Sequence, residues 1–418
     1  MKKFVIAAAC FSCLTMTGCS ALNFSVEGLI NAPKLTSEQS EIHQALIESV
    51  GSNITLKYPK NGEYRSAYVI ANIDDEPTDE AMVFYEYTSN GSEEDGLRVN
   101  ILDKDDSGKW YSVKELAGAG TDIDQVIISP MGNSNQIDVF VGYQNLTNDE
   151  KTLEIYSYAD GDFKRVALDT YSVLEPLDIN NDGYNELITI QRSTNNDTGA
   201  VTAKASMLKM QNNEITRSEG VDMCDNVTSY VSSKIGVLES GRRAIFIDGL
   251  TADGKLQTEM IYYRYSGLQN PMQLRSEKLL PMCTRPAGYY SEDMDGDGDV
   301  EIPSTSPMVG YENAVADEMV YMTTWSVYED FYDLKTKYTG YYAISDGYFV
   351  TFPKRWNNSV TVKKDSDTNE LVFYKYTGDI NESDEEIMRI AVSSKNDSDD
   401  YISDGYDLLT ARVSLIIS

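Results

Sequence analysis

Short runs of β-branched and aromatic residues, separated by turns rich in Gly, Asn and Asp, extend from Ile54 to about Tyr338. Examples are Val83-Phe-Tyr, Val139-Phe-Val, Ile188-Thr-Ile and Ile245-Phe-Ile. Runs of this length, bounded by turn residues, are typical of strands and too short for helices. The pattern predicts a mainly β chain made of many short strands.

One segment near the start of the chain has helical spacing instead. Its apolar residues recur at about one helical turn, at Ile42, Leu46 and Val50. Thr36 and Gln39 form a capping-box pattern at its beginning, and Gly51 suits the position after its last turn. The sequence therefore predicts a helix between Thr36 and Gly51.

The β region is repetitive, and its clearest copies are two acidic segments at 178–186 and 293–301. Both read D-x-[DN]-x-D-G-x-x-E. Aligning the ninth position of these segments with looser copies gives positions 80, 136, 186, 243 and 301, at intervals of roughly 50 to 58 residues. Such a period suits one four-stranded blade of a β-propeller. We count five blades directly, with six or seven left open by degenerate copies.

Beyond position 340 the spacing of strands continues without the acidic repeat. Four further runs read as successive strands; they are Gly347–Trp356, Val360–Lys364, Leu371–Tyr376 and Ile387–Val392. We therefore expect a helix-plus-propeller unit over residues 37–340 and a small β-rich C-terminal domain over 341–418.

Oxygen ligands recur at positions one, three, five, seven and nine of the two acidic segments, where the seventh offers its backbone carbonyl. In the first segment they are Asp178, Asn180, Asp182, Tyr184 and Glu186. In the second they are Asp293, Asp295, Asp297, Asp299 and Glu301. Gly at position six allows a sharp turn, and sets of hard oxygen ligands suit Ca²⁺. The sequence predicts two calcium sites; the alternative is a pair of Asp-rich turns without metal.

These segments are not EF-hand loops, because that loop needs a bidentate Glu at position twelve, where this chain has Thr189 and Ser304. They resemble the FG-GAP/VCBS repeat of integrin-type propellers. The stretch from Tyr58 to Glu80 also resembles the first blade of bacterial lipoproteins that carry such propellers. The resemblance covers roughly residues 37–340, and it implies a β-propeller with calcium loops between blade strands.

The first 19 residues have a basic start, a short apolar run and the ending Met16-Thr-Gly-Cys19. This composition indicates a secretory signal whose end resembles a bacterial lipobox. We therefore expect a signal peptide at 1–19, a lipid on Cys19, and a tether at 20–36. The chain would then be anchored to the cell membrane and face outside the cytoplasm. The alternative is an ordinary cleaved signal and full secretion.

The net charge of the chain narrows the classes of macromolecule that it can bind. The formal net charge is -32, which argues against nucleic acid as a partner.

Cys224 and Cys283 lie in two similar segments of the form M-C-x5-Y-x-S. An oxidising compartment permits a disulfide between them. The alternative, two buried thiols, is favoured because equivalent sites on adjacent blades can exceed the distance that a disulfide spans.

Patterns of catalysis are weak in this sequence. It contains no G-x-S-x-G elbow and a single histidine, His43. Ser206-x-x-Lys209 lies in a predicted strand, where the two side chains would not meet as they do on a helix. We therefore predict a non-catalytic, monomeric binding or assembly module that recognises an envelope protein or glycan. The alternatives are a glycan-active enzyme using paired carboxylates, as in propeller glycosidases, and a purely structural envelope protein.

Overall fold

The computed structural model describes residues 35–409, with gaps at 75, 89–95, 132–136, 146–149, 160–161, 196, 212–213, 330–332 and 395–397. Its strands form six antiparallel sheets. The predicted signal at 1–19, Cys19, nearly all of the tether at 20–36 and the loose repeat copy at 132–136 lie outside the described residues. Among the described residues, no helix is both long enough and apolar enough to cross a membrane.

The first three sheets follow one another along the chain. The first contains β1 (Ile54–Leu56), β2 (Tyr68–Ala71), β3 (Glu80–Tyr87), β4 (Leu97–Lys104) and β5 (Trp110–Ala117). The second contains β6 (Asp122–Pro130), β7 (Ile137–Gln144), β8 (Lys151–Ala159) and β9 (Asp162–Tyr171). The third contains β10 (Val173–Leu177), β11 (Glu186–Thr194), β12 (Val201–Gln211), β13 (Glu214–Arg217) and β14 (Val221–Asp222).

The remaining sheets continue this order. The fourth contains β15 (Val227–Val237), β16 (Arg243–Thr251), β17 (Lys255–Arg264), β18 (Gly267–Gln269) and β19 (Thr284–Pro286). The fifth contains β20 (Ile302–Pro307), β21 (Tyr321–Glu329), β22 (Asp333–Ala343) and β23 (Tyr348–Thr351). The sixth contains only β24 (Val360–Lys364), β25 (Leu371–Lys375) and β26 (Glu386–Ile390).

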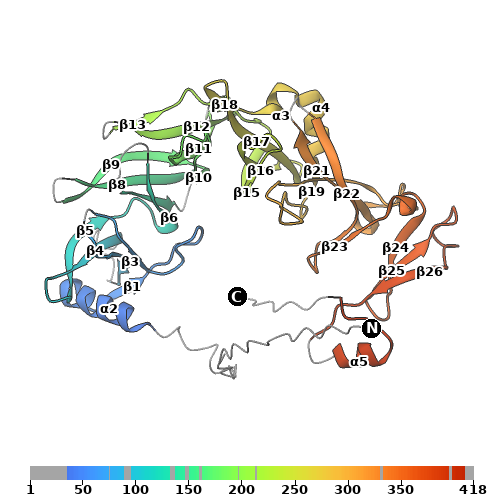
Figure 1. Cartoon of the computed structure of the whole chain (residues 1–418), viewed down its shortest axis with the longest axis horizontal. Helices are drawn as coiled ribbons and strands as arrows, with labels where there is room; N and C mark the ends of the chain where they lie inside the picture. Colours follow the sequence, from blue (N-terminus) through green and yellow to red (C-terminus); the bar gives the residue numbers. More distant parts are fainter. Residues whose placement is uncertain are drawn as a thin grey trace, which may run out of the picture.

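The sheets have the up-and-down strand order of propeller blades, and they lie along an arc with the first and sixth sheets at opposite ends (Figure 1). The four repeat positions that the structure describes, 80, 186, 243 and 301, fall at, or one residue before, the start of β3, β11, β16 and β20. The predicted fold class, a mainly β chain of blade-like antiparallel sheets with an N-terminal helix, is therefore confirmed.

Five of the six hydrophobic cores of the described residues lie between two consecutive sheets, and one lies between the N-terminal helix and the first sheet. One cluster joins Phe84 and Val99 of the first sheet to Val139 and Val141 of the second. Further clusters join the second sheet to the third, the third to the fourth, and the fourth to the fifth. Alternating side chains of a strand point to opposite faces, so each inner strand contributes to the cores on both sides. This packing explains why inner strands such as β3 and β7 are buried at nearly every position.

The helix α2 (Ser37–Val50) begins as the sequence predicts. The Thr36 hydroxyl accepts from Gln39 N at 3.1 Å, and the Gln39 side chain accepts from Thr36 N at 3.1 Å. Gly51 ends the helix at φ 85°, a region that favours glycine. Its buried face, Ile42, Ala45 and Leu46, packs on the first sheet.

Five shorter helical segments complete the described fold. They are α3 (Pro271–Leu274), α4 (Ser276–Cys283), α5 (Ser398–Ser403) and the two 3-10 turns η1 (Ala316–Glu318) and η2 (Lys354–Trp356). The first two form an insertion between β18 and β19, where Met272 and Leu279 are buried against the core between the fourth and fifth sheets.

The boundary that we placed between residues 340 and 341 falls inside β22. The next strand, β23, also belongs to the fifth sheet, because it pairs with β22 from Gly340–Thr351 to Ala343–Tyr348. Ala343 and Phe352 share a core with Val362 and Phe373 of the sixth sheet. Turns within a blade have the same composition as turns between domains, so the sequence pattern alone could not mark where the fifth sheet ends.

Cys224 and Cys283 are free, buried thiols, which is the state that the sequence favoured over a disulfide between them. Cys283 ends α4 and its Sγ lies 3.9 Å from the Met272 sulfur, while Cys224 accepts from Gln273 Nε2 at 3.2 Å. Burial raises the pKa of Cys283 to about 12. Both thiols therefore behave as small core residues.

Candidate metal centres in two acidic loops

The first acidic loop joins β10 to β11 in the third sheet, where Leu177 pairs with Glu186. Asn181 and Gly183 take positive φ values of 58° and 93°, which bend the backbone sharply. The bend turns backbone N–H groups inward. Both carboxylate oxygens of Asp178 accept from them, one from Asp182 N at 3.0 Å and the other from Gly183 N at 3.1 Å.

The remaining ligands predicted in this loop converge with Asp178. Asn180 Oδ1 accepts from Asp182 N at 2.8 Å, and Asp182 Oδ1 accepts from Tyr184 N at 3.0 Å. Glu186 is buried, and its Oε2 accepts from Ile179 N at 3.2 Å. Its other oxygen, Oε1, accepts from Asn180 Nδ2 at 2.5 Å. The Asn180 amide also donates to Asp182 Oδ2 at 2.8 Å, so the loop closes into a compact cage of polar side chains.

The second acidic loop leads into β20 of the fifth sheet and repeats this geometry. Asp293 accepts from Gly296 N at 2.7 Å and, through its other oxygen, from Gly298 N at 3.0 Å. Asp297 Oδ1 accepts from Asp299 N at 3.0 Å. Glu301 is buried and its Oε2 accepts from Met294 N at 2.7 Å. The backbone of Glu301 bridges to Glu292, as Glu186 pairs with Leu177.

Each cage also contains a lysine ammonium that the sequence pattern did not reveal. Lys209, on β12, lies 2.7 Å from Glu186 Oε1 and 3.7 Å from Asp182 Oδ2. Lys337, on β22, lies 2.9 Å from Asp295, 2.5 Å from Asp297 and 2.7 Å from Glu301. These lysines lie 23 and 36 residues after the glutamate they contact, so no local spacing rule could have found them.

Burial and the lysine contacts shift the pKa values of the groups in both cages. Burial opposes the charge of Lys337, but hydrogen bonds to Asp297, Glu301 and Asp295 outweigh it and raise its pKa. A hydrogen bond from the Tyr338 hydroxyl, together with Lys337, lowers the pKa of Asp295 to about 2. In contrast, burial raises the pKa of both Glu186 and Glu301 despite their lysine partners.

The donor set fits a hard cation. Oxygen atoms of Asp293, Asp295 and Asp297 all lie within 4.8 Å of one another. Calcium–oxygen distances of about 2.3–2.6 Å place opposite ligands about 5 Å apart, so one ion can reach all three. At position seven of each loop, the backbone N–H groups of Tyr184 and Asp299 donate to Asp182 and Asp297 of the same loop.

The degenerate first repeat lies in the same place in the first sheet, between β2 and β3. Ala71 pairs with Glu80, and Glu80 Oε2 accepts from Ile73 N at 2.8 Å. Its Oε1 is buried and has no hydrogen-bond partner. Ala81 pairs with Leu102, which places Asp103 beside Glu80 where the third sheet has Lys209. Burial, with Asp74 and Asp103 nearby, raises the pKa of Glu80 to about 7.

The fourth repeat has become an ordinary tight turn between β15 and β16. Leu238 N donates to Arg242 O at 2.8 Å, and Gly241 N donates to Leu238 O at 2.7 Å. Basic residues occupy its tip, as the sequence indicates. Among the described residues, the closed acidic loops are those of the third and fifth sheets.

The weak catalytic patterns have structural explanations. Ser206 and Lys209 both lie on β12, as expected, and Lys209 is engaged with Glu186 rather than with Ser206. His43 Nδ1 is hydrogen-bonded to the Tyr68 hydroxyl at 2.8 Å. Trp325 is buried and contacts Tyr342 and Phe349 edge to face. These side chains are used for packing and local hydrogen bonds.

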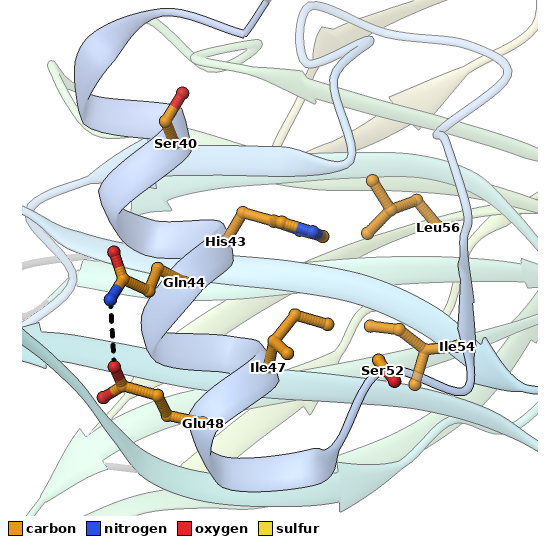
Figure 2. A pocket seen from close by; sticks show the side chains of 8 residues that line it. All are labelled: Ser40, His43, Gln44, Ile47, Glu48, Ser52, Ile54 and Leu56. Atoms are coloured by element: carbon orange, nitrogen blue, oxygen red, sulfur yellow. Dashed lines mark hydrogen bonds between the residues drawn. The ribbon is translucent and has the colours of Figure 1, made fainter.

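A groove of about 750 Å³ lies between α2 and β1 (Figure 2). Its apolar lining is Ile47, Ile54 and Leu56, and its polar lining is Ser40, His43, Gln44, Glu48 and Ser52. Gln44 Nε2 donates to Glu48 Oε1 at 3.1 Å. Glu48 is the one carboxylate among these lining residues, so the groove lacks the carboxylate pair that glycoside hydrolysis needs.

Comparison with known proteins gives distant structural likenesses. No family model and no curated protein sequence matches the chain. A Bacteroides fragilis protein provisionally described as a 6-phosphogluconolactonase is 11% identical and covers 81% of this chain and 94% of its own, at a TM-score of 0.31. The α-L-arabinanase of Penicillium chrysogenum is 9% identical, covering 78% and 93%, at a TM-score of 0.30. The rhamnogalacturonan lyase of Bacillus licheniformis is 9% identical, covering 81% and 78%, at 0.29.

Proposed function

We propose that this chain is a lipid-anchored, non-catalytic binding module at the outer face of the cell membrane, with two cation-holding loops that clamp its blades. One observation carries this proposal. The carboxylate oxygens of the two acidic loops are engaged by backbone N–H groups or by a lysine, as at Asp178 and Glu301. A catalytic metal site instead keeps a position open for substrate or water.

Calcium is the proposed cation. The resemblance of both loops to FG-GAP/VCBS repeats supports it, as does the all-oxygen donor set of residues 178–186 and 293–301. Each ion would hold the start of a blade strand to the loop before it. Because nearly all ligands come from one short loop, the ion would stabilise local structure and supply no reaction chemistry.

The anchor is proposed from the lipobox-like sequence that ends at Cys19. In a bacterial host, a fatty-acid analogue should label the wild type and leave Cys19→Ala unlabelled, since the thiol is the attachment point. Matched labelling of Cys224→Ala controls for reaction at another cysteine. Equal labelling of wild type and Cys19→Ala would overturn the anchor and leave the binding proposal standing.

Binding is tested with purified protein lacking residues 1–19. We expect saturable binding to an isolated envelope fraction that is recovered chemically unchanged. Pretreating the fraction with protease, or separately with glycan-degrading enzymes, distinguishes a protein partner from a glycan. Binding that never saturates would contradict a specific module.

The same experiment separates the module from the glycan-active alternative. Soluble sugar fragments released during incubation, and lost when a carboxylate outside both acidic loops is replaced, would overturn the non-catalytic proposal. Glu48→Gln is the first such variant, because Glu48 lines the groove between α2 and β1. Asp197→Asn, at a surface turn, is its control.

A further inference from the structure

Both acidic cages receive a positive charge from their own sheet. Lys209 Nζ lies 2.7 Å from Glu186, and Lys337 Nζ lies 2.5–2.9 Å from three carboxylates. These distances are close to those of calcium–oxygen bonds, about 2.3–2.6 Å. Each ammonium therefore engages carboxylates that a bound cation would also need, Glu186 in the first loop and Asp295, Asp297 and Glu301 in the second.

The two lysines reach this place by different routes. Lys209 is on β12, directly beside Glu186, because Leu187 pairs with Leu208. Lys337 is on β22, which is separated from β20 by β21. It reaches the loop from a register shift, because Trp325 pairs with Tyr338 while the next residue, Ser326, pairs with Thr336. Lys337 is thus the extra residue of a β-bulge, a feature that re-aims a side chain.

Unrelated positions that deliver the same charge indicate that each cage requires a cation. We propose that Lys337 and Lys209 are built-in cations, which hold the two loops closed without metal, and that a divalent ion binds a loop only by displacing the ammonium. This inference rests on the proposed assignment of the loops as cation-holding cages. Under it, the lysines determine how readily each loop takes up calcium.

The two cages should then differ in affinity. Lys337 contacts Asp295, Asp297 and Glu301, whereas Lys209 has one close carboxylate and a second at 3.7 Å. The side chains are similarly covered, at 24% exposure for Lys209 and 21% for Lys337, so the number of carboxylates makes the difference. Displacing Lys337 should be harder, and the loop of the third sheet should fill first.

Lys337→Met tests the proposal in protein lacking residues 1–19. Titration calorimetry with calcium chloride alone should show at least a tenfold gain in affinity at one site. Without its ammonium the variant should also melt at a lower temperature than wild type in EDTA. Calcium should restore that loss, because the metal replaces the missing charge.

Lys335→Met is the matched control. Lys335 lies on the same strand and pairs with Glu329 at 2.9 Å, away from the cage. It should leave calcium affinity and the difference between EDTA and calcium as they are in wild type. Lys209→Met provides an independent measurement at the other loop, with a smaller expected gain, should Lys337→Met fail to fold.

The outcomes separate two failures. If wild type and both lysine variants bind calcium with equal affinity, the cages hold metal but the lysines do not compete with it, and the inference is wrong. If none of them binds calcium, the calcium assignment itself falls and the inference with it. Neither result bears on envelope binding, which is measured separately.

Discussion

The loops of the first and third sheets occupy the same place in their blades and carry opposite charges at one position. In both, a buried glutamate begins the second strand of the repeat, Glu80 in one and Glu186 in the other. The residue beside it on the next strand is Asp103 in the first sheet and Lys209 in the third. The strand register around the glutamate is therefore the same in both sheets, but the charge beside it is negative in the first and positive in the third.

The comparison shows that the buried glutamate of such a loop needs a partner for each of its two oxygens. Glu186 shares its oxygens with Lys209, Asn180 and Ile179 N, so both oxygens have partners. Glu80 accepts from the backbone N–H groups of Ile73 and Asp74 but has no cationic partner, and its Oε1 is buried without a hydrogen-bond partner. A buried carboxylate without compensation prefers its neutral form, which explains why the pKa of Glu80 is raised to about 7.

Breaking the third-sheet loop should have the largest effect. Glu186→Ala removes the acceptor of Ile179 N and leaves Lys209 without its close partner. We expect a loss of about 2–4 kcal/mol in the free energy of unfolding, measured by urea denaturation in EDTA. Glu214→Ala, at an exposed position of β13, should change it little. A loss for Glu186→Ala no larger than that of the control would contradict the cage.

Neutralising Glu80 of the first sheet should increase the free energy of unfolding instead of lowering it. The folded pKa of Glu80 lies above its ordinary value of 4.5, so its contribution to stability is present below about pH 4.5 and is lost as pH rises through 7. Glu80→Gln keeps an acceptor for Ile73 N and should stabilise the protein by up to about 3 kcal/mol at pH 8. The gain should vanish near pH 4. Denaturation curves across this range check it, and a gain that does not depend on pH would be inconsistent with titration of Glu80.

Placing a lysine beside Glu80, as the third sheet has beside Glu186, should change the free energy of unfolding by less. Asp103→Lys replaces a like charge beside Glu80 with an opposite one, and we expect about 1 kcal/mol of stabilisation at pH 8. Asp103→Asn removes only the repulsion and should give less. The pH dependence caused by Glu80 should flatten in the lysine variant. If Asp103→Lys destabilises the protein at pH 8 more than at pH 4, a lysine at position 103 does not compensate Glu80 as Lys209 compensates Glu186.

Removing calcium should have the smallest effect. For weak extracellular sites with a Kd of ~10⁻⁴–10⁻³ M, about 1 mM calcium contributes roughly 0.4–1.4 kcal/mol per site. EDTA should therefore lower the melting temperature slightly without unfolding the chain. Asp182→Ala, in the third-sheet loop, should abolish more of the calcium response than Asp297→Ala in the fifth. The same calcium binding in wild type and in the double variant would refute the metal assignment.

The sequence by itself determined the local features of this protein. Alternation of apolar runs and turn residues placed the strands, because side chains on a strand repeat every second residue. The capping residues Thr36 and Gln39 placed the start of α2, because they bond within one turn. The acidic spacing placed both loops, since the predicted ligands, such as Asp178 and Glu186, lie within nine consecutive residues.

Only the tertiary structure decided the features that depend on distant pairing. Lys337 is far from Glu301 in sequence, and its approach depends on a register shift between β21 and β22. Asp103 meets Glu80 only because β4 pairs with β3 in one register. The end of the fifth sheet at Thr351 likewise follows from pairing of β23 with β22. Strand register is set by cooperative packing of whole sheets, so the charge that each loop receives is a property of the fold.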